Sequence, residues 1–221
     1  MRWTEQPIHF VDFEGSLSSG ILEYGVATLL GGQVTAVVTR LCAPTGRIDP
    51  ADMRIHGLRG EALKAFAPFA DDWEVFAGFR EKGPLAAHYA GAENSLIRAV
   101  WPYPRSSPDF ARPGGTSTEW GPWIDSARLY SQLYPRLESG RLEALVAACG
   151  LQSELDRLAK AHCPKERRRY HAAPYDALAG ALLIGSLAAH PPVASLTVMQ
   201  LLALSTLDSR KRDSMIQRDL F

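Results

Sequence analysis

The 221-residue sequence has few cysteines, no long hydrophobic run and no visible repeat, and each of these absences argues against a class of protein. Its three cysteines (Cys42, Cys149 and Cys163) are odd in number and form no CxxC pair. This pattern argues against a disulfide framework or a zinc knuckle and indicates a reducing, cytoplasmic compartment. The longest apolar run, residues 177–189, contains Gly and Ser and is too short to span a membrane. The first residues also lack the basic-then-apolar layout of a secretory signal.

The sequence has no net charge either, since 24 acidic residues balance 24 basic ones. This balance argues against a protein that grips long duplex nucleic acid mainly through a basic face. It is compatible with an enzyme that takes one chain end into a pocket, where bound cations would supply positive charge. The remaining composition, 46% hydrophobic and 22% charged, is that of an ordinary globular domain.

Hydrophobic patterning predicts an α/β fold with a mixed sheet. A buried first strand is expected at 7–13, and two further strands at 21–30 and 34–41 join across Gly31 and Gly32, a tight hairpin signal. Shorter strands are expected at 84–89 and from Trp123. Helices are predicted from about Arg59 and over 71–82, 92–101, 141–149, 153–162, 174–190 and 194–204. Residues 102–121, rich in Pro, Gly and Ser, form a surface insertion or a substrate-contacting loop.

The first strand carries an acidic pair, Asp12 and Glu14. Residues two apart on a strand leave the same face of the sheet, and the apolar neighbours Val11 and Phe13 indicate a central, buried strand. Two adjacent buried carboxylates repel each other and lose hydration, so a divalent cation is an economical partner for them. The alternative is that the strand ends at Val11 and that both side chains lie in a solvated loop.

A second candidate segment is residues 171–176, in which His171 precedes a helix that begins near Pro174 and carries Asp176 in its first turn. An imidazole in the incoming loop can swing toward the carboxylate and collect a proton near neutral pH. The alternatives are a helix-dipole role for Asp176 and a simple exposed position for His171. The arginines at 167–169 just before this loop contact phosphate or form a solvated face.

Taken in order, six segments resemble the motifs of the DEDD exonuclease superfamily in its histidine-containing branch (DEDDh). That branch includes the proofreading epsilon subunit of bacterial DNA polymerase III and ribonuclease T. The resemblance runs from about Ile8 to Ala188. The segments are residues 11–16 (VDFEGS), 22–26 (LEYGV), 54–58 (RIHGL), 87–93 (AHYAGAE), 124–126 (IDS) and 171–176 (HAAPYD).

The resemblance implies a ribonuclease H-like fold, with a central mixed five-stranded sheet flanked by helices. Its exonuclease domain would cover residues 1–190, with a C-terminal helix and charged tail at 191–221. The implied activity is 3′–5′ removal of nucleoside monophosphates from single-stranded DNA or RNA ends. It implies two Mg²⁺ or Mn²⁺ ions and a general base, His171. The implied metal-binding residues are Asp12, Glu14, Glu93 and Asp176. The implied substrate-contacting residues are Phe13, Gly15, Ser16, His56 and Tyr89.

The sequence departs from the family pattern at three positions. Glu93 stands where the family has Asp, Tyr89 where it often has Asn, and Gly15 where it usually has Thr. Because glutamate has the charge and oxygen ligands of aspartate, we expect a retained but altered metal dependence.

Three function classes follow from the sequence. The first is an active exonuclease. The second is a catalytically impaired nucleic-acid-binding or interaction module, which the glutamate at position 93 favours. The third is a structural partner in a polymerase or repair complex that docks through its C-terminal helix and tail. A Ser/His/Asp hydrolase is disfavoured because the sequence contains no GxSxG elbow.

Overall fold

The computed structural model describes residues 1–206 and residue 210. In this part of the chain a mixed five-stranded sheet has the order β3-β2-β1-β4-β7. The first three strands are antiparallel neighbours, whereas β4 and β7 run parallel to β1. The strands are β1 (Ile8–Ser16), β2 (Gly20–Leu30), β3 (Gln33–Leu41), β4 (Leu85–Ala87) and β7 (Ile124–Asp125).

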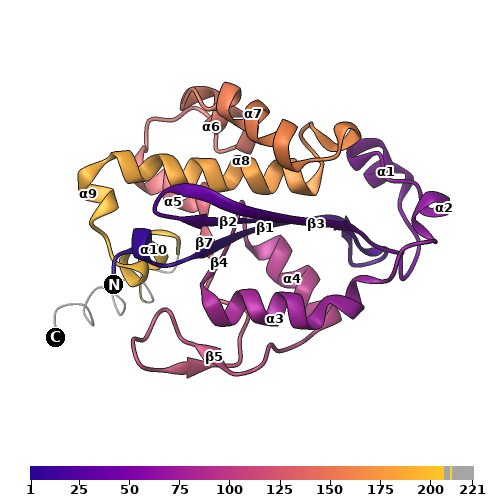
Figure 1. Cartoon of the computed structure of the whole chain (residues 1–221), viewed down its shortest axis with the longest axis horizontal. Coiled ribbons are helices and arrows are strands. Elements are labelled where there is room, and N and C mark those ends of the chain that lie inside the picture. The colour runs from indigo at the N-terminus through magenta and orange to yellow at the C-terminus, as the bar shows by residue number, and fades with distance from the viewer. Residues whose placement is uncertain (207–209, 211–221) are drawn as a thin grey trace.

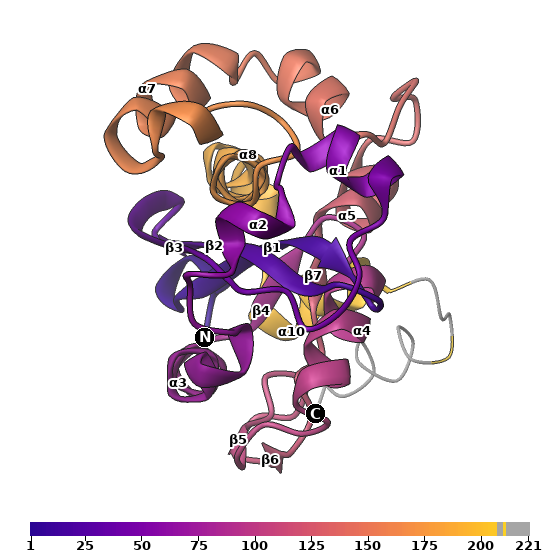
Figure 2. The same cartoon turned by 90° about the vertical axis from the view of Figure 1, so that its right-hand side faces the viewer.

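Helices cover both faces of this sheet (Figures 1 and 2). On one face, α8 crosses β1, β2 and β3, with α6 and α7 packed behind it; α3 and α4 cover the other face. The helices are α1 (Pro50–His56), α2 (Gly60–Leu63), α3 (Trp73–Lys82), α4 (Gly91–Val100), α5 (Ser126–Leu133), α6 (Leu142–Ala148), α7 (Gln152–His162), α8 (Ala173–Ser186), α9 (Pro191–Ala194) and α10 (Val198–Leu204).

Two glycines let α8 lie directly against the sheet. A Cβ atom added to Gly25 of β2 would lie 2.3 Å from the carbonyl oxygen of Ala173. A Cβ atom added to Gly180 of α8 would lie 1.9 Å from the ring of Phe10 on β1. Because no side chain larger than hydrogen fits at either point, the first half of α8 is held close to β1 and β2.

The predicted first strand and hairpin are confirmed. β1 continues through Ser16, so the alternative in which the strand ends at Val11 is wrong. Strands β2 and β3 join at Gly31 and Gly32, which both have positive φ, as the sequence predicted.

The helix predicted from about Arg59 is only the four-residue α2, and the sequence analysis missed α1 before it. The start of α1 has a clear local cause. The side chain of Asp49 accepts a hydrogen bond from the amide of Ala51 at 2.6 Å, and Pro50 follows at the first helical position.

The insertion at 102–121 is anchored rather than structureless. It contains a two-stranded ribbon of β5 (Ser107–Pro108) and β6 (Thr116–Ser117), which lies on the α3 side of the sheet (Figure 2). The fully buried Arg80 of α3 donates hydrogen bonds of 2.8 to 3.1 Å to four carbonyl oxygens, those of Pro108, Glu119, Trp120 and Gly121. One guanidinium therefore satisfies backbone groups in β5 and at the end of the insertion.

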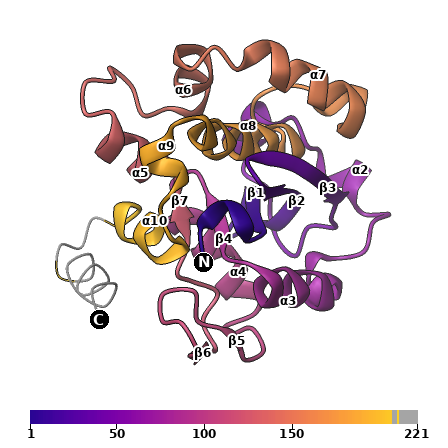
Figure 3. The same cartoon turned by 60° about the vertical axis from the view of Figure 1, so that its left-hand side comes forward.

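The two ends of the described chain lie together. The amide of Trp3 donates to the carbonyl oxygen of Leu196, and its indole NH donates to that of Val193. Figure 3 shows the N-terminus beside α10. The helix predicted over 194–204 begins only at Val198, as α10, because Thr197 forms a capping box with Gln200 and starts the helix there. The predicted start at Ala194 coincides instead with the last residue of the short α9.

The predicted charged tail, apart from Arg210, lies outside the described residues. Within residues 1–206 and 210, no helix has the length and apolar character that a membrane crossing requires.

Candidate active site

The acidic pair of β1 faces the α8 side of the sheet. In the register of the sheet, Asp12 lies opposite Gly25 and Glu14 lies opposite Glu23 of β2. The intervening Phe13 points the other way, into the core, where its ring packs 5.4 Å from that of Phe69. This alternation places both β1 carboxylates under the start of α8.

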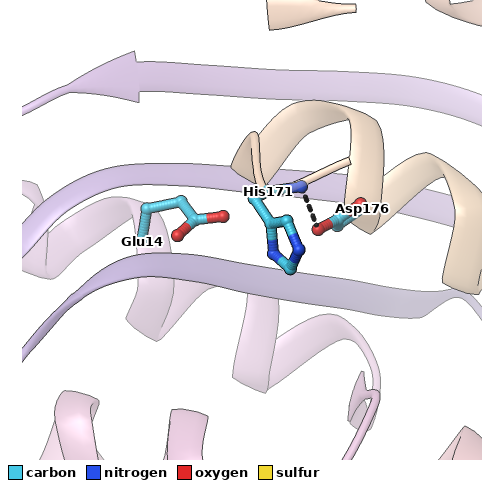
Figure 4. A group of neighbouring side chains, drawn as sticks. All are labelled: Glu14, His171 and Asp176. Atoms are coloured by element: carbon cyan, nitrogen blue, oxygen red, sulfur yellow. Dashed lines mark hydrogen bonds between the residues drawn. The ribbon is translucent and has the colours of Figure 1, made fainter. Parts of the chain in front are cut away.

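The loop before α8 brings an imidazole and a third carboxylate to this pair. Ligand atoms of Glu14, His171 and Asp176 lie within 4.8 Å of one another, and Figure 4 shows the imidazole between the two carboxylates. His171 has a φ of 60°, and its main-chain amide donates to Oδ2 of Asp176 at 3.0 Å. The turn that carries the imidazole is therefore closed by the carboxylate beside it.

Asp12 and Glu93 complete the acidic cluster. Asp12 lines one pocket together with Tyr89, His171 and Asp176. Glu93 approaches from α4 and is buried, and its negative charge is one of the influences that raise the pKa of Asp12. The structure thus brings Asp12, Glu14 and Asp176 together from β1 and α8, and Glu93 of α4 lies near enough for its charge to act on Asp12.

These carboxyl groups have strongly raised pKa values. Burial, followed by the charges of Asp176 and Glu14, raises the pKa of Asp12 well above its usual range. Burial, followed by the charge of Asp176, raises the pKa of Glu14 to about 8. Burial also raises the pKa of Glu93 and that of Asp176, each to about 7. The common cause is negative charge held out of water with too little positive charge beside it.

Two observations indicate that divalent cations fit this cluster. Oε2 of Glu93 and Oδ1 of Asp176 are buried and have no hydrogen-bond partner. Arg167, whose charge acts on Glu14 and Asp176, is already paired with Glu23 at 2.5 Å. Carboxylate oxygens are the ligands that Mg²⁺ and Mn²⁺ prefer, and cations would satisfy the orphan oxygens and the excess charge together.

The raised pKa values predict a pH dependence of stability in chelator. Glu14, Glu93 and Asp176 bind protons more tightly in the folded chain than in the unfolded chain, so their stabilising contribution is lost as pH rises through about 7 to 8. His9 acts in the opposite sense, because burial lowers its pKa to about 4 in the folded chain. Its effect on stability no longer changes with pH above 6.5, the pKa of the unfolded chain, so it does not alter the trend at higher pH. We therefore expect the Tm to fall between pH 6.5 and 8.5.

Thermal melts in chelator at several pH values would measure this fall. Excess Mg²⁺ or Mn²⁺ provides the control, since the Tm difference between metal and chelator should widen as the pH rises. A Tm that rises over this window in chelator would contradict the electrostatic account.

The segment 87–93 is held in place by Asp125, which caps the start of α5. Its carboxylate accepts hydrogen bonds from the amides of Tyr89 and Ala90 at 3.3 and 3.1 Å, and from the amide of Arg128 at 3.1 Å. Tyr89 has a φ of 58°, so this carboxylate supports a strained turn just before α4. Asp125 lies in one of the family-like segments, but its role in supporting this turn has no signal in the sequence.

The predicted substrate-contacting residues occupy different environments. Tyr89 lines the pocket and is 47% exposed. The side chains of Phe13 and His56 are buried and are not part of the pocket lining, and Nδ1 of His56 accepts a hydrogen bond from the amide of Leu58. The hydroxyl of Ser16 is bonded to Ser18 and Ser19 in the turn after β1.

Gly15 has a structural reason to be glycine. It follows a bulge in the pairing of β1 with β2 and has a φ of 136°. A Cβ atom at this position would lie 2.2 Å from the carbonyl oxygen of Gly20. The side chain that the family usually has here is therefore excluded by both the backbone conformation and the space.

Sequence reasoning missed several residues of the pocket, because they become neighbours only through the packing of α6 and α8. The pocket is also lined by His88, Arg141, Leu142, Glu143 and Tyr170. His88 lies within the matched segment 87–93, and Tyr170 lies next to His171, whereas the other three residues had no local signal. Of the arginines at 167–169, Arg167 is buried and paired with Glu23. The prediction that placed it in an exposed basic cluster is therefore wrong.

Comparison with known proteins places this fold among exonucleases. No family model and no curated protein matches the sequence. Exonuclease X in complex with 5′ overhanging duplex DNA is similar over 90% of this chain and 99% of that chain, at 22% identity and a TM-score of 0.61. The nuclease domain of 3′hExo, a DEDDh family member bound to rAMP, is similar over 88% and 97%, at 11% identity and a TM-score of 0.62.

Exonuclease I from Methylocaldum szegediense is similar over 96% of this chain, at 14% identity and a TM-score of 0.65, but this chain spans only 45% of its length. These likenesses confirm the predicted α/β ribonuclease H-like fold, with its mixed five-stranded sheet flanked by helices. They also confirm, for the fold, the predicted resemblance to DEDDh exonucleases.

Proposed function

We propose that the protein is a divalent-cation-dependent 3′–5′ exonuclease that releases nucleoside monophosphates from single-stranded DNA or RNA ends. The observation that carries this proposal is that Glu14 and Asp176 lie within 4.8 Å of the imidazole of His171, beside a pocket that Asp12 also lines. The buried Glu93 lies near enough for its charge to act on Asp12. Groups this distant along the sequence gain nothing in stability from meeting, because their charges repel. The likeness in fold to known exonucleases supports the same proposal.

The four carboxylates are the side chains that would hold two Mg²⁺ or Mn²⁺ ions. Bound there, the cations would supply positive charge to the attacking and leaving oxygens of an in-line displacement at phosphorus. Glu93, with a buried oxygen that has no partner, would contribute from the α4 side. The requirement for cations follows from the charge of the cluster.

His171 is the general base in this proposal. It is exposed, so water and a chain end can reach its ring, and it lies between Glu14 and Asp176 (Figure 4). Imidazole is the side chain best suited to accept a proton from water near neutral pH. Tyr89 and Arg141, on the lining of the same pocket, are placed to contact the terminal nucleotide and its phosphate.

The proposal is tested by incubating purified protein with a 5′-labelled single strand and either Mn²⁺ or Mg²⁺. We expect a ladder of products shortened one nucleotide at a time, and chelator should stop it. Parallel DNA and RNA strands of one sequence would identify the preferred sugar. Binding of the strand without shortening under either metal would favour the impaired-module alternative instead.

Glu93→Asp is the variant that examines the departure from the family pattern. Shortening the buried side chain by one methylene moves its carboxylate within the cluster, and a displacement of about 1 Å changes rates by as much as about 10²-fold. We expect the ratio of Mg²⁺-supported to Mn²⁺-supported kcat to change by about tenfold or more. Equal ratios in variant and wild type would show that Glu93 lies outside the metal-binding set.

A matched control for this variant is Glu138→Asp, which makes the same chemical change at an exposed position. If wild type is inactive and Glu93→Asp cuts, the defect lies in this one side chain. That result would support the second candidate function, an impaired nucleic-acid-binding module, which the presence of Glu93 specifically favours.

A further inference from the structure

A buried ion pair lies directly beside the acidic cluster. Nε and Nη2 of Arg167 donate to the two carboxylate oxygens of Glu23 at 2.8 and 2.5 Å. Both side chains are almost completely buried. Glu23 lies opposite Glu14 in the pairing of β1 with β2, yet its charge is matched by the two-pronged contact with the guanidinium. It is therefore set apart from the carboxylates that lack a partner.

The pair also ties together three segments that are distant in sequence. Oε2 of Glu23 accepts a hydrogen bond from the amide of Ala173 at 2.9 Å. Nη1 of Arg167 donates to the carbonyl oxygen of His56 at 2.7 Å, and Nη2 donates to that of His171 at 3.3 Å. Strand β2, the end of α1 and the loop that carries the imidazole thus meet at one guanidinium.

The position of the imidazole depends on this arrangement. Among residues 1–206 and 210, we find no hydrogen bond that fixes the ring of His171. The residue is held through its backbone. Its amide donates a hydrogen bond to Asp176, and its carbonyl oxygen accepts one from Arg167. Its φ of 60° is a conformation that non-glycine residues adopt only when their surroundings impose it.

We propose that Arg167, paired with Glu23, is a positioning residue that sets the imidazole of His171 against Glu14. This inference rests on the proposed exonuclease function, because positioning matters only if the imidazole moves a proton. A buried ion pair is a poor source of stability, since desolvation offsets the attraction. The planar guanidinium offers several donors in fixed directions, which suits a group that must hold several backbone segments in fixed positions relative to one another.

Arg167→Met, made together with Glu23→Gln so that no unpaired charge is left buried, tests the proposal. We expect kcat to fall by about 10²-fold, the scale of a 1 Å misplacement, with little change in KM. The single variant Arg167→Ala should show the same loss, and added guanidinium should restore a large part of its kcat. Arg168→Met is the matched control, because this exposed neighbour donates only to the carbonyl oxygens of Lys160 and Cys163.

Hydrogen exchange of the His171 amide provides a readout that does not require activity. We expect this amide to lose protection in the double variant and to keep it in Arg168→Met. If wild type shortens no strand, the exonuclease proposal fails while the exchange result still decides whether Arg167 fixes the loop. Wild-type kcat and unchanged His171 protection in the double variant would overturn the positioning role.

Discussion

Asp176→Asn is expected to abolish strand shortening, with a loss of roughly 10³-fold or more, while leaving the protein folded. The negative charge of Asp176 acts on the neighbouring carboxyl groups of the cluster, and its Oδ1 is buried without a hydrogen-bond partner. The variant keeps an amide oxygen that can accept the hydrogen bond from the His171 amide. It removes one of the negative charges that a cation needs.

The same variant should melt at a higher temperature than wild type in chelator. Repulsion from Asp176 contributes to the raised pKa values of Asp12 and Glu14, so its neutralisation relieves both groups. Added Mn²⁺ should then raise the Tm of wild type more than that of the variant. Asp71→Asn, at an exposed position on the α3 side, is the control for the change of charge. A lower Tm in chelator, or undiminished cutting, would contradict the assignment.

His171→Asn should lower kcat by about 10²- to 10⁴-fold, the range that a general base contributes. Asparagine is chosen because it tolerates the left-handed backbone that His171 adopts, so the variant removes the imidazole without adding backbone strain. The measurement is single-turnover cutting at saturating strand and metal. His162→Asn, at the exposed end of α7, should cut like wild type.

Metal titration of the same variant separates two roles for the imidazole. If the imidazole acts as a base, its removal should leave the affinity for Mn²⁺ within a few-fold of the wild-type value, because the carboxylates remain. The distances from Glu14 and Asp176 also permit the imidazole to bind a metal ion. If it does, its removal should weaken Mn²⁺ binding along with kcat. A weakened Mn²⁺ affinity in parallel with kcat would therefore overturn the assignment of His171 as the base.

The features that could be predicted from the sequence are those with a local physical cause. The two-residue period placed Asp12 and Glu14 on one face of β1, and Gly31 with Gly32 identified the hairpin. Pro174 marked the start of α8 within one residue. Only the ordered set of family motifs, and not any single one, indicated that these segments converge.

The features that could not be predicted depend on contacts between distant segments. Arg80 looks like any helix arginine in the sequence, and only the folded insertion shows that its guanidinium binds four carbonyl groups. Arg167 and Glu23 are 144 positions apart, so nothing local distinguishes Arg167 from the exposed arginine that follows it. Helix α1 was missed for a different reason. Its start has a local signal in Asp49 and Pro50, but the helix is short and buries only the side chain of His56, so it has no apolar period to detect.

Because of the bulge after Glu14, Glu93 and Gly15 differ in how easily each could be replaced by the residue of the family pattern. Glu93 can be exchanged for aspartate in one step, since the smaller residue needs no new space. A threonine at position 15 would collide with the opposing strand at the Gly20 carbonyl, so it requires a rebuilt turn as well. A protein engineer could therefore introduce the family's aspartate at position 93 by point mutation, whereas its threonine at position 15 would demand a grafted loop.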